Sequence, residues 1–214
     1  MEKTLVTKST GLEPTTFPHA KGLVFDSHLP MKKIHLDRFT HTRMLIMKED
    51  LDISFEYIIR CIDFSWITTF IEDESNREKS SKEFVQILHN IPRLRSLCLN
   101  ISTLIVFFDQ HWPQIIELTM NSNSCDSRKS LSSIEIDVFW YSFIQLERLA
   151  FDRQCIRKLS RLLNNMTMTL SDIWIHYHDN LDDSNPPLIT RQWLEQNTDL
   201  CNFDYFYDNK WDVH

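Results

Sequence analysis

The stretch Pro92-Arg93-Leu94-Arg95-Ser96-Leu97-Cys98-Leu99 decides the fold, because it reads as a proline followed by the apolar pattern L-x-x-L-x-L. The stretch Trp112-Pro113-Gln114-Ile115-Ile116-Glu117-Leu118-Thr119-Met120 repeats it, and the first apolar position moves 21 residues, from 94 to 115. Self-similarity at a period of roughly 20–30 residues is typical of proteins built from stacked structural repeats. Further copies with the same spacing begin at Ala20, Leu146, Leu170 and Leu200.

Segments with helical spacing of apolar residues separate these strands. Pro92 and Pro113 each stand where a helix should end and a strand begin, because proline disfavours helix in the residue before it. Strands that alternate with helices predict an α/β fold. More narrowly, the pattern predicts an irregular leucine-rich-repeat solenoid, with parallel strands on the concave face and helices on the convex face. The helical returns are expected between Ser81 and Pro92, at 102–111, at 153–164 and around Trp193.

The chain is expected to consist of a lead-in and one domain. Residues 1–16 are polar and Thr-rich, which predicts a flexible N-terminal segment. Residues 17–214 are predicted to form the solenoid, with clear repeats from about residue 83. Before that point the pattern is weaker. It predicts strands at 21–25 and near 66–71, an irregular repeat or added strand at Met31, Ile34 and Leu36, and a charged surface loop at 72–82.

The composition narrows the classes of function. The formal net charge is −7, whereas broad binding of nucleic acid or anionic membranes needs a basic face. The chain has only 2 glycines, which excludes the glycine-rich phosphate-binding loops of nucleotide and dinucleotide enzymes. We therefore expect no cofactor, no nucleic-acid partner and no membrane partner.

The cysteines and the N-terminal sequence bear on the compartment. The 5 cysteines are scattered and include no C-x-x-C pair, so they predict neither a disulfide framework nor a zinc ribbon. Free thiols are typical of a reducing compartment. The first residues carry no apolar leader, and no apolar run is long enough to span a membrane. These features predict a cytoplasmic or nuclear protein.

Residues between the inward leucines are predicted to face outward on the concave side, because side chains alternate along a strand. Five predicted outward carboxylates face one arginine, so this surface is expected to be net negative and to suit a protein partner with a basic patch. Aromatic anchors concentrate the energy of interfaces, which makes Trp174 the best single candidate, although packing against a neighbouring Phe is an open alternative. The predicted partner-binding residues are Glu117, Arg148, Asp152, Asp172, Trp174, His176, Asp204 and Phe206.

His176, His178 and Asp179 supply the main competing chemistry. The two histidines would lie on one face of an extended segment, but a metal site needs a third ligand that the spacing does not identify. We therefore expect a polar strand end rather than a metal site, and a chain that is not an enzyme. Two alternatives stay open: a metal-dependent hydrolase-like enzyme that uses this region, and a decayed paralogue without function.

The proline-led strands with irregular helical returns resemble the leucine-rich repeats of F-box proteins. The resemblance covers most of residues 17–206 and is clear from 83 onward. It implies an intracellular protein-binding function, namely substrate recognition in an F-box-type ubiquitin ligase. In that family an N-terminal F-box docks the cullin-ligase adaptor. Residues 1–16 are too short to hold an F-box, so the adaptor is an expected partner only if an F-box exists outside this chain.

Overall fold

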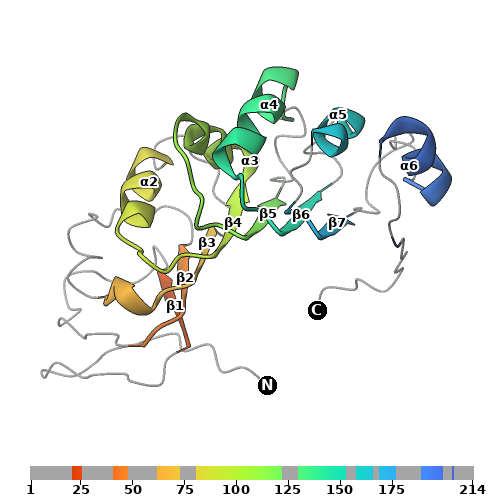
Figure 1. The fold of residues 1–214 in the computed structure, drawn as a ribbon. Helices are drawn as coiled ribbons and strands as arrows, with labels where there is room; N and C mark the ends of the chain where they lie inside the picture. The colour runs from red at the N-terminus through yellow and green to blue at the C-terminus, as the bar shows by residue number, and fades with distance from the viewer. Residues whose placement is uncertain are drawn as a thin grey trace, which may run out of the picture.

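One parallel sheet organises the molecule, which we describe from a computed structural model. The structure describes residues 21–25, 41–47, 62–72, 81–121, 130–152, 158–165, 169–176, 189–199 and 204. In these residues the sheet has seven strands, whose spatial order follows the chain, and it is open because β1 and β7 are its edges (Figure 1). Every neighbouring pair is parallel. The strands are Gly22–Phe25 (β1), Met44–Met47 (β2), Thr69–Glu72 (β3), Ser96–Asn100 (β4), Glu117–Asn121 (β5), Arg148–Asp152 (β6) and Asp172–His176 (β7).

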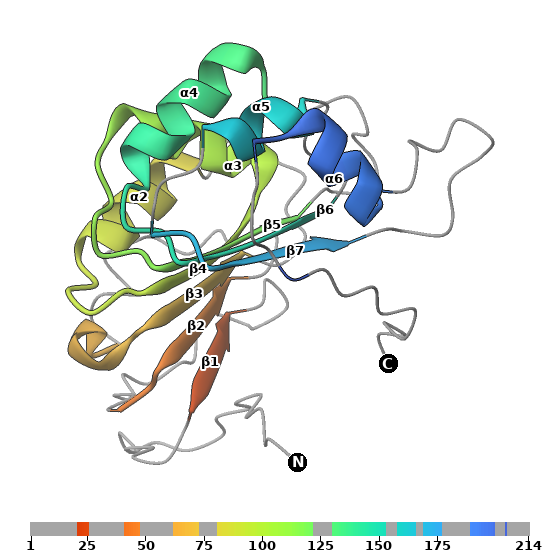
Figure 2. The same ribbon diagram turned by 45° about the vertical axis from the view of Figure 1, so that its right-hand side comes forward.

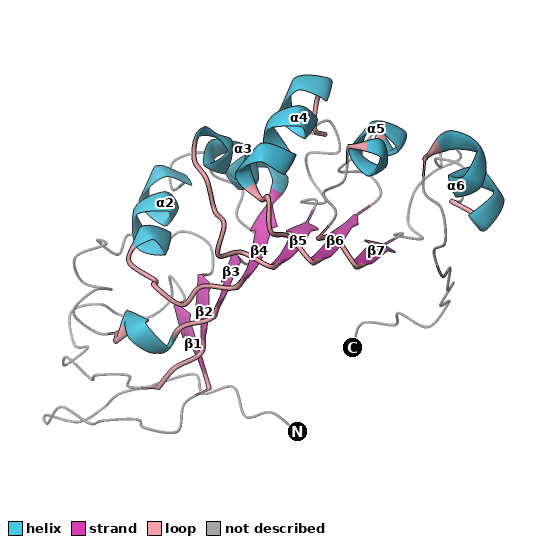
Figure 3. Ribbon diagram, viewed as in Figure 1, coloured by secondary structure: helices cyan, strands magenta, loops and turns pink. Residues whose placement is uncertain are grey.

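Helices return the chain between strands, because parallel neighbours need a crossover. The described α-helices lie together on the outer side of the curved sheet (Figures 1 and 3). The fold is therefore α/β, as the sequence predicts, and the expected helical returns are confirmed where the structure describes them. The helices are Ser81–His89 (α2), Ile101–Val106 (α3), Ser133–Ser142 (α4), Leu159–Asn164 (α5) and Arg191–Asn197 (α6), with 3-10 turns at Phe64–Trp66 (η2) and Phe107–Asp109 (η3).

The core lies between the sheet and the helices. A ladder of inward side chains crosses all seven strands in register, and it is buried in every strand except β7, where Ile173 is half-buried. Burial of each such side chain stabilises the fold by about 1.5–3 kcal/mol. The ladder consists of Leu23, Leu45, Phe70, Leu97, Leu118, Leu149 and Ile173.

Successive returns are also joined by hydrogen bonds from buried indoles and hydroxyls. The Trp140 Nε1–H of α4 donates to the backbone carbonyl of Leu162 in α5 at 3.0 Å. The Ser142 hydroxyl donates to the carbonyl of Phe108 at 3.1 Å. Buried polar groups of this kind need a partner, so these bonds fix each return against its neighbour.

The sequence predicts a charged surface loop at 72–82, and this prediction is wrong for Glu72, the first residue of that segment. Its side chain is fully buried at the end of β3. One carboxylate oxygen accepts the backbone N–H of Asn100 at 2.9 Å, and the other accepts the Thr103 hydroxyl at 2.7 Å. The carboxylate therefore caps the start of α3, where the Asn100 side chain makes no capping bond. Residues 73–80 lie outside the described part of the chain.

The strands at 21–25 and near 66–71 are confirmed by β1 and β3, whereas β2 is absent from the predictions. The buried Thr42 takes the place of the first leucine before Leu45 and Met47, which hides the repeat from a search for leucines. The strand expected at Met31, Ile34 and Leu36, and the copy beginning at Leu200, lie outside the described residues. No helix in the part of the chain that is described is long and apolar enough to cross a bilayer.

Candidate functional site: the open face of the sheet

The face of the sheet opposite the helices is the candidate site. No described helix covers it (Figure 2). Alternation presents two rows of outward side chains across the seven strands. The first row is Gly22, Met44, Thr69, Ser96, Glu117, Arg148 and Asp172; the second is Val24, Ile46, Ile71, Cys98, Thr119, Ala150 and Trp174.

The charged residues of the first row gather on the last three strands. Glu117, Arg148 and Asp172 are register neighbours, and Arg148 forms an ion pair with Glu117. The Asp172 carboxylate accepts the Ser171 hydroxyl at 2.8 Å and forms no ion pair with any described residue. Because Arg148 offsets only one of the two carboxylates, this part of the row is net negative.

Trp174 ends the second row and is 44 % exposed. Its register neighbour is Ala150, whose small side chain leaves the indole without an aromatic neighbour on β6. No ring contact joins Trp174 to a described residue, so the alternative that it packs against a neighbouring Phe finds no support in this part of the chain. Exposed tryptophans are enriched at protein interfaces, where charged residues lie at the polar rim around the buried centre.

Asp152 is buried, so its predicted place on the exposed surface is wrong. Asn100, at the corresponding end of β4, is buried as well. Each is the last residue of its strand, and alternation no longer keeps a side chain in solvent where the strand ends. His176, the register partner of Asp152, is half-buried. The carboxylate that belongs to the open face at this end is therefore Asp172.

The first strands add apolar residues that the sequence predictions omit. Met44, Ile46 and Ile71 project onto the open face and are half-buried. The missed signal is the alternation around β2, Thr42-x-x-Leu45-x-Met47, which repeats the spacing of the other strands with a threonine in the first position. The open face is thus apolar on β1–β3 and charged on β5–β7.

The remaining predicted residues fall outside this surface or outside the described residues. Asp204 is exposed and lies in no strand. Phe206, His178 and Asp179 lie outside the part of the chain that the structure describes. Among the described residues no group of three or more His, Cys, Asp or Glu side chains is placed to hold a metal ion.

Comparisons with known proteins found no match. The searches of family models, curated proteins and solved structures returned nothing that matches this chain. What the open face can do therefore follows from its residues and their geometry.

Proposed function

We propose that this chain is a non-enzymatic protein-binding scaffold of the leucine-rich-repeat type, and that its partner docks on the open face of the sheet. The observation that carries the proposal is the exposed Trp174 beside the Asp172 carboxylate on a sheet face that no described helix covers. Strands in chain order, each with an L-x-x-L-x-L spacing of inward residues, support the repeat class.

The charge of the face defines the partner. The row Glu117, Arg148 and Asp172 is net negative, so the partner presents a basic patch to β5–β7. Next to this row, Trp174 fits an apolar pocket on the partner. The half-buried Met44, Ile46 and Ile71 on the first strands extend the contact with apolar surface.

Substrate recognition in an F-box-type ubiquitin ligase is the specific form of this function that the resemblance of the repeats favours. The partner on the open face would then be the substrate. The cullin-ligase adaptor would be held by an F-box outside this chain, in the cytoplasm or the nucleus.

A paired-variant purification tests the proposal. The tagged chain is recovered from native cells in three forms: wild type, Trp174→Ala/Asp172→Lys, and Tyr141→Ala/Asp109→Lys. The last is a matched control, because it removes an exposed aromatic side chain and reverses an exposed carboxylate on the helical side. Circular dichroism melts establish that the three forms are equally folded.

We expect quantitative mass spectrometry to find a partner set that the wild type and the control share and the open-face variant lacks. A cullin adaptor in that set would support the ligase form. Equal recovery by all three forms would contradict docking on the open face.

A further inference from the structure

A second surface, at the edge of the sheet where strands β1–β4 begin, has the opposite charge to β5–β7. It consists of Lys21, His41, Arg43, Trp66, Arg93 and Arg95, all exposed, and we call it the basic edge. Among residues 21, 41–43, 62–68 and 90–95, which directly precede these four strands, Asp63 is the one carboxylate. In a chain of net charge −7, this concentration of cations is a local feature.

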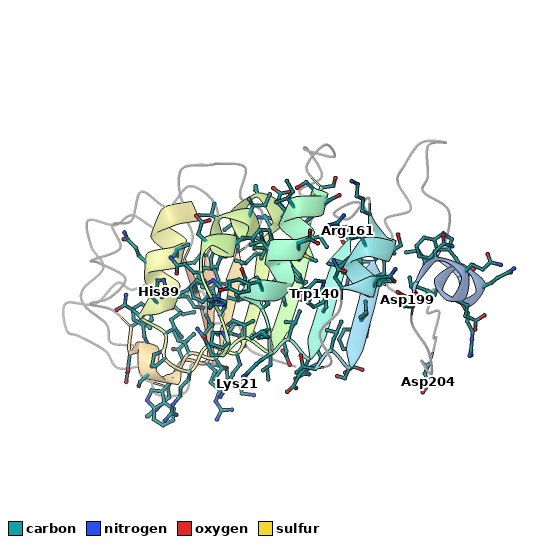
Figure 4. All side chains as sticks on the ribbon, turned by 45° about the horizontal axis from the view of Figure 1, so that its top comes forward. Lys21, His89, Trp140, Arg161, Asp199 and Asp204 are labelled. Carbon is teal, nitrogen blue, oxygen red and sulfur yellow. The ribbon has the colours of Figure 1, made fainter. Side chains whose placement is uncertain are left out.

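Backbone register aligns the cations. Arg43 N donates to the carbonyl of Lys21, Thr68 N to the carbonyl of Arg43, and Arg95 N to the carbonyl of Thr68. Lys21, Arg43 and Arg95 therefore stand on one line across four strands that are spaced about 4.8 Å apart. In Figure 4, Lys21 lies at the lower end of the sheet, and Arg161 lies on the side of the helices, away from it.

An aromatic and cationic cluster precedes this line, because His41, Trp66 and Arg93 each lie two residues before a residue of the line. The His41 and Trp66 rings form a T-shaped pair with their centroids 4.8 Å apart, and the Arg93 guanidinium lies 5.3 Å from the centre of the Trp66 ring. His41 holds a φ of 72°, in the left-handed region that favours glycine. A non-glycine residue there marks a site that the surrounding structure constrains.

Within the described part of the chain, the cationic groups of the basic edge have almost no polar partners. Lys21, Arg43 and Arg93 make no side-chain hydrogen bond or ion pair with the described residues, and Arg95 donates only to the carbonyl of Gln114 at 3.3 Å. The Arg93 guanidinium lies over the Trp66 ring and makes no hydrogen bond with the described residues. An arginine fork matches the two oxygens of a carboxylate. Asp63 is engaged locally: Ser65 N–H donates to it, and hydrogen bonding by Ser65, with a smaller effect of His41, lowers the pKa of its carboxyl.

We propose that the basic edge binds an acidic segment of a partner protein, with carboxylates on the arginines and an apolar side chain against Trp66. A nucleic acid fits less well, because the line of cations ends at β4. On β5–β7 the same register positions are occupied by Ile116, Glu147 and Ser171. A polyanion would find no cation there and would be repelled by the Glu147 carboxylate. This proposal does not depend on what the open face binds.

Fluorescence anisotropy with the full chain tests the proposal. The probe is a labelled peptide of four Glu-Glu-Leu repeats, compared with four Lys-Lys-Leu repeats, four Glu-Glu-Gly repeats and a twelve-nucleotide oligouridine. The variants are Arg43→Gln/Arg95→Gln, Trp66→Ala, and the control Arg161→Gln/Arg191→Gln, which removes the same charge from helices α5 and α6.

We expect the wild type to bind the Glu-Glu-Leu peptide and not the Lys-Lys-Leu peptide. Arg43→Gln/Arg95→Gln should weaken binding at least about tenfold, and the control less than about twofold, because the contact is local. Trp66→Ala should weaken binding of the Glu-Glu-Leu peptide more than that of the Glu-Glu-Gly peptide. A salt titration of the wild type, which needs no variant, should weaken binding steadily.

Three results would overturn the proposal: no binding of the acidic peptide by the wild type, equal losses in the two double variants, or tighter binding of the oligouridine.

Discussion

At the scale of single residues, Glu72 shows how one buried side chain links the end of strand β3 to the start of helix α3. It occupies the third inward position of its strand, after Ile67 and Phe70, where the other repeats place Leu, Met, Phe or Ile. A buried carboxylate is costly unless hydrogen bonds satisfy it, and here the Asn100 N–H and the Thr103 hydroxyl do so. The residue that looks like the start of a solvated loop is therefore a joint between β3 and α3.

Glu72→Ala should lower the free energy of unfolding by about 2–4 kcal/mol, because the buried Asn100 N–H loses its acceptor and the side-chain volume is left empty. Glu72→Gln keeps one acceptor oxygen and should cost less. Urea unfolding followed by circular dichroism measures both, with the exposed Asp109→Ala as the control. A loss for Glu72→Ala no larger than that of the control would show that the carboxylate does not cap α3.

The limits of prediction at this scale are physical. Leu94, Leu97 and Leu99 identify their strand because each apolar side chain has one inward position. Glu72 and Asp152 cannot be placed in the same way, because burial of a carboxylate depends on donors from another repeat or on where the strand ends. The exposed state of Trp174 follows from alternation and is confirmed.

At the scale of elements, the sequence predicts the position of a helix or strand where capping residues and prolines agree with the apolar pattern. Helices α2 and α3 end before Pro92 and Pro113, as predicted. Strand β2 escapes prediction because Thr42 breaks the leucine pattern, and only its pairing with β1 and β3 reveals it. Helix α4 carries a further local signal, a capping box in which Ser132 and Glu135 bond reciprocally to each other's backbone.

Ser132→Ala should cost about 1 kcal/mol of stability, because the hydroxyl that accepts the Glu135 N–H is lost. Ser132→Asp, which retains an acceptor and adds a negative charge at the helix start, should restore most of the loss. Chemical denaturation of the three proteins measures the differences. If Ser132→Asp is as unstable as Ser132→Ala, the capping box contributes nothing to α4.

At the scale of the whole molecule, alternation along the strands separates an inward ladder from an open face. The α/β class and most strand positions are predictable, because neighbouring parallel strands in register place their inward residues at the same spacing. The division of the open face into an apolar and a charged part is only partly predictable, since Met44 and Ile46 belong to the strand that the pattern hides.

Substitutions at Met44 and Leu45, adjacent residues of β2, test whether the strand has one buried face and one open face. Leu45→Ala should cost about 2–5 kcal/mol, because Leu45 is fully buried in the ladder. Met44→Ala removes a side chain of similar size from the open face and should cost less than about 1 kcal/mol. Thermal and urea unfolding measure both. Equal losses would show that β2 has no open side.

Hydroxyl-radical footprinting of the chain with and without its purified partner tests the central claim, that partners dock on the open face. Trp174 and Met44 lie on that face, and Tyr141, which is 63 % exposed, lies on the helical side. We predict that the partner protects Trp174 and Met44 from oxidation and leaves Tyr141 unchanged. Protection of Tyr141 with unchanged oxidation of Trp174 and Met44 would contradict the account and move the binding surface to the helices.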